Sequence, residues 1–173
     1  MPTPADLTIL PAMPDDVPAI LRFIRMLAEY EKLTHMVVAD EQKLRETLFG
    51  PRPFAEVLIA RLGEEPAGFA LFFHNYSTFL AKPGIYLEDL FVLPELRGRG
   101  VGKALLRALA GIAKQRNCGR LEWSVLDWNE PAIGFYQRLG AAVLPDWRIC
   151  RLTEEGIKTL AGSTGGSKSD VRI

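Results

Sequence analysis

The sequence contains little cysteine and little histidine. Its 173 residues include two cysteines and two histidines. Cys118 and Cys150 are too far apart for a Cys-x-x-Cys pair, and two cysteines make no disulfide framework. His35 and His74 lie in separate segments without partners at metal-ligand spacing. We therefore expect no metal site and a reducing, cytoplasmic location.

An excess of one charge and long apolar runs are also missing. The 21 lysines and arginines balance 21 aspartates and glutamates, so no net field attracts a phosphate backbone or an anionic lipid surface. No stretch reaches the roughly 18 apolar residues of a membrane-spanning helix. Residues 1–6 lack the basic start of a secretion signal. We therefore expect no nucleic-acid partner, no membrane span and no secretion.

Apolar residues are abundant instead. They make up 48% of the chain, which is enough to build a core and excludes wholesale disorder. The length fits one domain on the usual scale of about 100–200 residues per domain. We expect a single domain of residues 1–161, followed by a Gly/Ser-rich flexible tail of residues 162–173.

The spacing of apolar residues in the first half predicts two helices and three strands. Asp40 is placed to cap the second helix, and Pro51 prevents its continuation. Two β-rich runs with a short polar connection predict an antiparallel hairpin. The predicted elements are a strand at Leu7–Leu10, a helix from Val17 to about Tyr30, a helix from Asp40 to Gly50, and strands at Phe54–Leu62 and Pro66–Tyr76.

The second half predicts an alternation of strand and helix. The run Ile85–Leu93 is apolar on both faces except at Glu88 and Asp89, which predicts a central strand covered on both sides. A strand, a helix and a strand in this order predict a parallel crossover. The later elements are a helix from Val101, a strand at Leu121–Leu126, a helix from about Glu130 to Leu139 and a last strand at Trp147–Leu152. The fold class is mixed α/β, with helices on both faces.

A glycine-rich turn, Arg97–Gly102, stands between a predicted strand and a predicted helix. Glycines let the backbone approach a ligand closely, and the free N–H groups at the start of the helix attract an anion. A phosphate or pyrophosphate is the expected ligand. The G-x-G-x-x-G and Walker patterns do not match. The alternative is a tight turn whose glycines serve steric needs alone.

The pattern R-x-x-G-x-G, formed by Arg97, Gly100 and Gly102, resembles that of the GNAT family of acetyl-CoA-dependent N-acetyltransferases. Within this family the chain looks most like the diamine (spermidine/spermine-type) and thialysine acetyltransferases, over roughly residues 5–155. The shared segments are Tyr86–Asp89, Trp128–Pro131, Phe135–Tyr136 and Leu139–Gly140. The resemblance implies the GNAT fold: a mixed sheet, antiparallel in its N-terminal part, with a splayed parallel pair in its C-terminal part. It also implies a homodimer.

The resemblance implies acetyl-CoA as the cosubstrate. The backbone of Leu90, Phe91 and Val92 is expected to bind the pantetheine arm. The residues expected to hold the pyrophosphate are Arg97, Gly98, Arg99, Gly100, Val101, Gly102 and Lys103. Asn129 and Pro131 are expected beside the cofactor, although capping of the helix from Glu130 explains Asn129 equally well.

Two residues are candidates for proton transfer. The resemblance implies that Tyr136 protonates the departing CoA thiolate, and a core tyrosine on one stripe with Ile133 is the alternative. Glu88 is the candidate base, because a carboxylate in an apolar strand is costly unless it is paired or has a raised pKa. A structural pair with a neighbouring strand is the alternative for Glu88. Alternation along the strand sends Asp89 to the opposite face, where we expect a structural role.

The acceptor is expected to be a primary amine of a small diamine, a polyamine or a lysine-like amino acid. The resemblance places Tyr30, Glu31 and Glu88 beside that amine, and Asp146 is the acid that remains before Trp147 in a shortened stretch. No cysteine falls at the expected thioester position, so we expect direct attack on acetyl-CoA. Two alternatives stay open: acetylation of a peptide or protein, and a non-catalytic acyl-CoA-binding sensor.

Overall fold

The computed structural model describes residue 4 and residues 6–162. The chain divides into two compact units, residues 1–124 and residues 125–173, and each is described by itself. The elements of the first unit are β1 (Leu7–Pro11), η1 (Pro14–Asp16), α1 (Val17–Tyr30), η2 (Thr34–Met36), α2 (Glu41–Phe49), β2 (Glu56–Leu62), β3 (Glu65–Ser77), β4 (Lys82–Val92), η3 (Pro94–Leu96), α3 (Val101–Gln115) and β5 (Leu121–Trp123). The elements of the second unit are α4 (Glu130–Arg138) and α5 (Glu154–Gly162).

The sheet of the first unit has five strands in the order β1-β2-β3-β4-β5. Strands β1 to β4 pair antiparallel, and β5 pairs parallel to β4 with Ile85 opposite Leu121. Helix α3 connects the parallel pair, as a parallel crossover requires. The predicted mixed sheet and the predicted hairpin of β2 and β3 are confirmed. Strand β5 is shorter than predicted and ends at Trp123.

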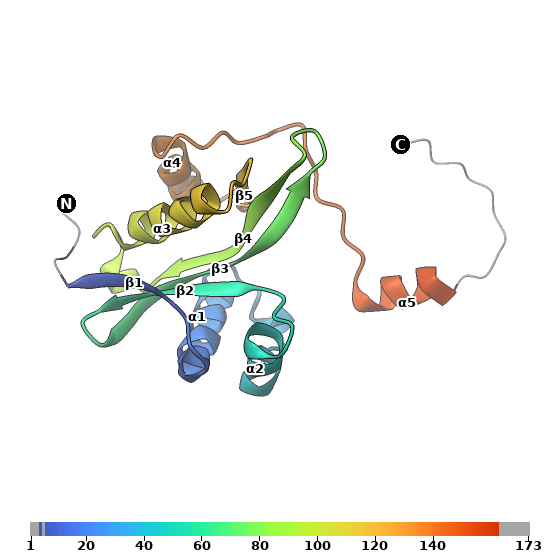
Figure 1. The fold of residues 1–173 in the computed structure, drawn as a ribbon. Coiled ribbons are helices and arrows are strands. Elements are labelled where there is room, and N and C mark those ends of the chain that lie inside the picture. The colour runs from blue at the N-terminus through green and yellow to red at the C-terminus, as the bar shows by residue number, and fades with distance from the viewer. Residues whose placement is uncertain (1–3, 5, 163–173) are drawn as a thin grey trace. The chain divides into compact units, whose positions relative to one another are not determined.

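Helices cover both faces of this sheet, as expected for the fold class. Helices α1 and α2 lie against one face and α3 lies against the other (Figure 1). On the first face, the ring of Phe23 packs at 5.7 Å from that of Phe69 and at 5.8 Å from that of Phe91. On the other face, Leu105 and Leu109 of α3 are fully buried. The periodic apolar stripes of α1 and α3 therefore build two layers of core around one sheet.

Two helices begin at the residues that sequence alone identifies as caps. The Asp40 carboxylate accepts a hydrogen bond from the N–H of Lys43 at 2.8 Å. The Asn129 side chain accepts one from the N–H of Ala132 at 3.3 Å. Each bond satisfies a backbone donor that the first helical turn leaves without an intrahelical partner.

Helix α5 was not among the predicted elements. Its start carries Glu154 and Glu155, and the N–H of Gly156 lies 3.5 Å from the Thr153 hydroxyl. Lys158 pairs with Glu154 one turn earlier, at 2.5 Å. A hydroxyl before two acids and an i,i+4 ion pair are sequence signals of a helix start. These signals are sufficient to predict α5 from the sequence.

The predicted last strand, Trp147–Leu152, is wrong. These residues have no regular secondary structure, and Trp147 and Ile149 are 78% and 69% exposed. A strand needs a neighbour that accepts and donates its backbone hydrogen bonds. Its alternation of apolar and polar residues is thus not sufficient to make it a strand.

The C-terminal tail and the absence of a membrane span are two further expectations. The expected flexible tail of residues 162–173 lies outside the described residues, apart from Gly162, which ends α5. Among the described helices, none combines the length and the apolar character needed to cross a membrane.

The aromatic layer beneath α1 generates a stability prediction. Phe69 is completely buried, so Phe69→Ala should lower the free energy of unfolding by about 3–5 kcal/mol, because it removes buried surface and leaves a cavity. Phe79 is 97% exposed, so Phe79→Ala serves as the control and should change it by less than about 0.5 kcal/mol. Urea unfolding followed by circular dichroism measures both, and equal losses would contradict the described core.

Candidate active site

Strand β4 contains a β-bulge at Glu88. Leu71 of β3 pairs with Asp89, and Phe72 pairs with Leu87, so Glu88 is an extra residue with no partner of its own. A bulge interrupts the strict alternation of side chains along a strand. Glu88 and Asp89 consequently line the same pocket, on the face that α1 covers. The expectation that Asp89 points to the opposite face is therefore wrong.

The pocket at this bulge, which we call the acidic pocket, has a volume of about 380 Å³. Three carboxylates line it: Glu31, immediately after α1, and Glu88 and Asp89 of β4. Among the described residues that line it, none is basic. The remaining wall is apolar and comes from α1 and from the segment 33–39. Such a lining suits a small organic cation: the carboxylates face its charge, and the apolar wall faces its methylene groups.

The three carboxylates differ in their surroundings. Burial, together with the smaller effect of the nearby charges of Glu88 and Glu31, raises the pKa of Asp89 to about 6. Burial also raises the pKa of Glu31. Glu88 is exposed, so the expected burial of this residue is wrong, and Asp89 is the enclosed member of the pair. The cluster concentrates negative charge that a bound cation would relieve.

One edge of β4 is open beyond the bulge. Strand β5 stops with Trp123 opposite Leu87, so among the described residues no strand pairs with β4 on that side from Glu88 onward. The Leu93 N–H donates to the Ala67 carbonyl of β3 at 3.0 Å.

Backbone direction along this edge follows from that bond. Because backbone groups alternate in direction, Leu90 and Val92 turn their N–H and C=O toward the open edge, and Phe91 turns its own toward β3. The side chain of Phe91 is buried. Of the three residues expected to bind pantetheine, Leu90 and Val92 therefore present backbone groups at the open edge. An added strand would pair with β4 at this edge.

The glycine-rich turn has the geometry of an anion site. Gly98 and Gly100 have φ angles of 73° and 86°, in the left-handed region that favours glycine. Helix α3 begins at Val101, and no side chain caps it. Its first N–H groups and the positive end of its dipole therefore face outward from the turn. Arg99 and Lys103 are exposed beside them.

The side chain of Arg97 is directed away from the turn. Its Nε–H donates to the Val92 carbonyl at 3.1 Å. Its guanidinium carbon lies 4.9 Å from the centre of the Tyr30 ring and 5.6 Å from that of Phe91. The guanidinium thus lies at the junction of α1, β4 and the turn, where cation–π contacts hold it.

The remaining predicted site residues belong to the second unit. Tyr136 is half-buried on α4, and its ring lies 5.3 Å from that of Phe135. Pro131 occupies the first turn of α4, where a missing N–H costs nothing, and Asn129 caps that helix. Asp146 is exposed in a turn. Within the first unit, the structure brings together Glu31, Glu88 and Asp89.

Sequence reasoning missed the apolar wall of the acidic pocket. Leu33, Met36, Val37 and Val38 line the pocket from a segment that contains only the short η2 helix. The signal was an apolar run between two helices with no core face of its own to explain it. Apolar residues outside regular elements often line a site, because loops held by a rigid scaffold carry binding residues.

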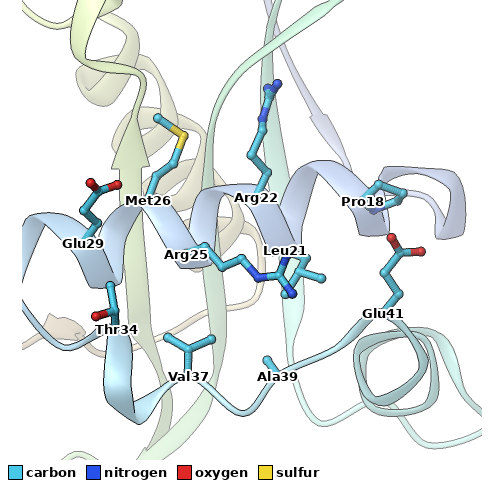
Figure 2. Close-up of a pocket in the computed structure, with 10 residues that line it drawn as sticks. All are labelled: Pro18, Leu21, Arg22, Arg25, Met26, Glu29, Thr34, Val37, Ala39 and Glu41. Carbon is cyan, nitrogen blue, oxygen red and sulfur yellow. The ribbon is translucent and has the colours of Figure 1, made fainter.

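A second hollow, of about 530 Å³, lies on the other side of the segment 37–39. Val37 and Ala39 line both hollows, so this stretch of chain is the partition between them. Figure 2 shows their side chains directed toward α1, with Arg25 and Glu29 on the helix. In residues 4 and 6–162, no group of three or more His, Cys, Asp or Glu side chains is arranged so that it could hold a metal ion.

Comparison with known families identifies the class of this protein. Residues 22–141 match the acetyltransferase (GNAT) family. The chain therefore belongs to this family and is an N-acetyltransferase. GNAT acetyltransferases use acetyl-CoA as the cosubstrate. The five-stranded mixed sheet with its parallel β4–β5 pair is the GNAT fold, as the resemblance implied.

Individual relatives act on small amines according to their names. L-ornithine N5-acetyltransferase of Arabidopsis thaliana is 37% identical, over 86% of this chain and 85% of that protein. Thialysine N-epsilon-acetyltransferase of Bos taurus is 40% identical, over 83% of this chain and 90% of that protein. Spermidine/spermine N(1)-acetyltransferase-like protein 1 of Homo sapiens is 30% identical, over 84% of this chain and 22% of that protein. These names are consistent with acetyl transfer to a primary amine and do not favour the peptide or sensor alternatives.

A solved structure agrees in fold. An integron cassette protein from the mobile metagenome of V. cholerae has a TM-score of 0.77 and 26% identity, over 92% of this chain and all of that chain.

The raised pKa of Asp89 generates a prediction about stability and pH. An acid whose pKa rises from 3.8 to about 6 on folding binds more protons in the folded state between about pH 4 and 6. The free energy of unfolding therefore falls as the pH rises through that window. Asp89→Asn should raise the free energy of unfolding by on the order of 2 kcal/mol at pH 7.5, where Asp89 is charged. At pH 4 the same substitution should change the free energy of unfolding little.

Urea unfolding at both pH values measures this effect. The exposed Asp15 serves as the matched control, and Asp15→Asn should leave the stability nearly unchanged at both pH values. An equal effect of Asp89→Asn at pH 4 and at pH 7.5 would contradict the assignment.

Proposed function

We propose that the chain transfers acetyl from acetyl-CoA to a primary amine of a small diamine, polyamine or lysine-like amino acid. One observation carries the proposal: Glu31, Glu88 and Asp89 converge on a pocket with apolar walls, within an N-acetyltransferase fold. Amines of this class combine one or more ammonium groups with a short methylene chain. The ammonium groups pair with the carboxylates, and the methylene groups contact the wall from α1 and residues 33–39.

Acetyl-CoA binds along the open edge of β4 and at the start of α3. The pantetheine amides pair with the outward backbone groups of Leu90 and with the N–H of Val92, whose carbonyl accepts from Arg97, as an added strand would. The pyrophosphate lies on the N–H groups at the start of α3, with Arg99 and Lys103 supplying positive charge. Support comes from the unpaired edge and from the uncapped helix start. Asn129 and Pro131 are assigned to the same ligand by resemblance.

The two units act together in this proposal as one catalytic domain of residues 1–161. The family match supports it, because residues 22–141 run across the boundary between the units. The expected acid Tyr136 belongs to the second unit and the carboxylates belong to the first.

The reaction requires that the acceptor lose a proton. A primary amine has a pKa of about 10.4, so well under 1% of it is neutral at pH 7. Glu88, the exposed carboxylate of the pair, takes this proton through water. Glu31 and Asp89 pair with the cation that a second amino group of the substrate retains. The ion pairs with Glu31 and Asp89 thus keep the substrate oriented while its other nitrogen becomes nucleophilic.

The neutral nitrogen then attacks the thioester carbonyl directly. The C–N bond forms, the C–S bond breaks, and the Tyr136 hydroxyl gives its proton to the departing thiolate. As the amide forms, the attacking nitrogen releases its second proton to solvent. Solvent returns a proton to the tyrosinate, and the proton taken by Glu88 also leaves to solvent. No covalent enzyme intermediate is needed.

The proposal includes a cytoplasmic homodimer that works without nucleic acid. Exposed apolar side chains support the dimer: Trp147 and Ile149 are exposed in a segment whose sequence favours a strand but which has no regular secondary structure. A second copy could supply a strand partner for it. The thiols of Cys118 and Cys150 are free, which fits a reducing compartment.

Turnover of small amines is the first prediction of this function. Release of CoA is measured with spermidine, putrescine, diaminopropane, ornithine, lysine, thialysine and a lysine peptide. At least one free small amine should turn over strongly. Glu88→Gln and Tyr136→Phe should each lower kcat by about 10²-fold or more, as general base and general acid.

Matched controls separate chemistry from folding. Glu64→Gln alters an exposed acid of the β2–β3 turn, and Tyr76→Phe alters an exposed tyrosine of β3, so both should retain full turnover. Turnover of the peptide alone would favour the protein-acetylating alternative. Tight acetyl-CoA binding without any turnover would favour the sensor.

Oligomeric state is a separate prediction. Analytical ultracentrifugation at 10 μM should give a dimer. Trp147→Ser together with Ile149→Ser should give a monomer, because the double change removes the exposed apolar side chains of the segment. A wild-type monomer at this concentration would overturn the dimer.

A further inference from the structure

Arg97 joins three parts of the first unit through one side chain. It is the first residue of the glycine-rich turn, yet its Nε–H donates to the Val92 carbonyl and its guanidinium stacks on the rings of Tyr30 and Phe91. Val92 belongs to the open edge of β4, and Tyr30 is the last residue of α1. The turn, the edge and the end of the helix therefore meet at this guanidinium.

The platform beneath the guanidinium is fixed. Phe91 is buried and packs on Phe23 in the core. Tyr30 is instead partly exposed, at 38%, and its place depends on its contacts at the surface. A planar guanidinium stacks on a ring and donates a directed hydrogen bond at the same time, which an ammonium does not do. Arginine is thus the residue type that this junction requires.

The end of α1 contains one residue in a strained backbone conformation. The chain reverses after Tyr30 through Lys32, whose φ of 61° lies in the left-handed region, and the N–H of Leu33 donates to the Ala28 carbonyl at 2.7 Å. A lysine in that conformation is strained by about 1 kcal/mol relative to glycine. The contact of Tyr30 with Arg97 therefore adds to the backbone hydrogen bonds that close this helix end.

The chain that leaves this helix end forms part of the acidic pocket. Glu31 follows Tyr30 directly, and the segment 33–39 supplies the apolar wall. Val37 and Ala39 of that wall are directed toward α1 (Figure 2). A shift of Tyr30 moves both the carboxylate of Glu31 and the start of this wall.

We propose that Arg97 is a positioning residue that couples the acetyl-CoA site to the acidic pocket through its stack on Tyr30. The proposal rests on the proposed function for its two ligands. Acetyl-CoA orders the turn and the β4 edge, which holds Arg97 in place. Arg97 then holds Tyr30, Glu31 and the wall in the arrangement that binds the amine. By linkage, a bound amine tightens acetyl-CoA by the same factor.

A double-mutant cycle on Arg97 and Tyr30 tests the coupling. Arg97→Lys and Tyr30→Leu should each raise the KM of the amine about three- to tenfold, the range expected from one cation–π contact. The double variant should be no worse than either single variant, because both remove one interaction. Tyr30→Phe keeps the ring, so Arg97→Lys should raise the KM of the amine by the same factor in the Tyr30→Phe protein as in wild type. Additive effects in the cycle would overturn the proposal, and so would the absence of an Arg97→Lys effect in the Tyr30→Phe protein.

A matched arginine separates coupling from cofactor binding. Arg99→Lys alters the other arginine of the turn and should raise the Kd of acetyl-CoA, measured by calorimetry, while leaving the KM of the amine within about twofold. Tyr30→Leu should weaken the mutual tightening of acetyl-CoA and amine. An Arg97→Lys variant that behaves like Arg99→Lys would show that Arg97 serves the cofactor alone.

Hydrogen exchange supplies a readout that needs no turnover. Free CoA added to the wild-type protein should slow amide exchange in residues 31–39 by about threefold or more, and it should have little effect there in Arg97→Lys. If no amine on the panel turns over but this protection occurs, the proposed function fails and the coupling stands. If CoA protects residues 98–103 but leaves residues 31–39 unchanged in wild type, the coupling fails.

Discussion

One extra residue in β4 determines where the acidic pocket of this N-acetyltransferase lies. The bulge at Glu88 turns two successive carboxylates to the face beneath α1, where Glu31 joins them. Pairing with β5 stops at Leu87, one residue before the bulge. The acidic pocket and the open edge therefore begin at the same point of one strand, which is the arrangement needed to bring an amine beside a thioester.

Much of the fold followed from the sequence because its signals were local. Apolar periodicity predicted α1 and α3, and the short polar side chains of Asp40 and Asn129 predicted where two helices begin. The segment Trp147–Leu152 shows the limit of such reasoning. Its residue types favour a strand, but a strand also needs a partner, and the choice of partner is a property of the whole assembly rather than of a window of residues.

The site was predicted unevenly for a related reason. The glycine-rich turn was recognised because its glycines mark local backbone geometry, and Gly98 and Gly100 have positive φ angles. Asp89 was misassigned because strict alternation holds only in a regular strand, and a bulge is set by the register with β3. Arg97 was assigned to the pyrophosphate because its motif suggests it. Its contact with Tyr30, 67 positions earlier in the chain, is a tertiary one that no local pattern contains.

The open edge of β4 has a consequence for the protein without its ligand. Unpaired N–H and C=O groups on a strand edge are a template on which another extended chain can grow, and such edges lead proteins to aggregate. In this enzyme the pantetheine arm would pair with that edge as an added strand does. Bound acetyl-CoA would then protect the protein from aggregation, and the concentration of acetyl-CoA would affect the fraction of unaggregated protein as well as the reaction rate.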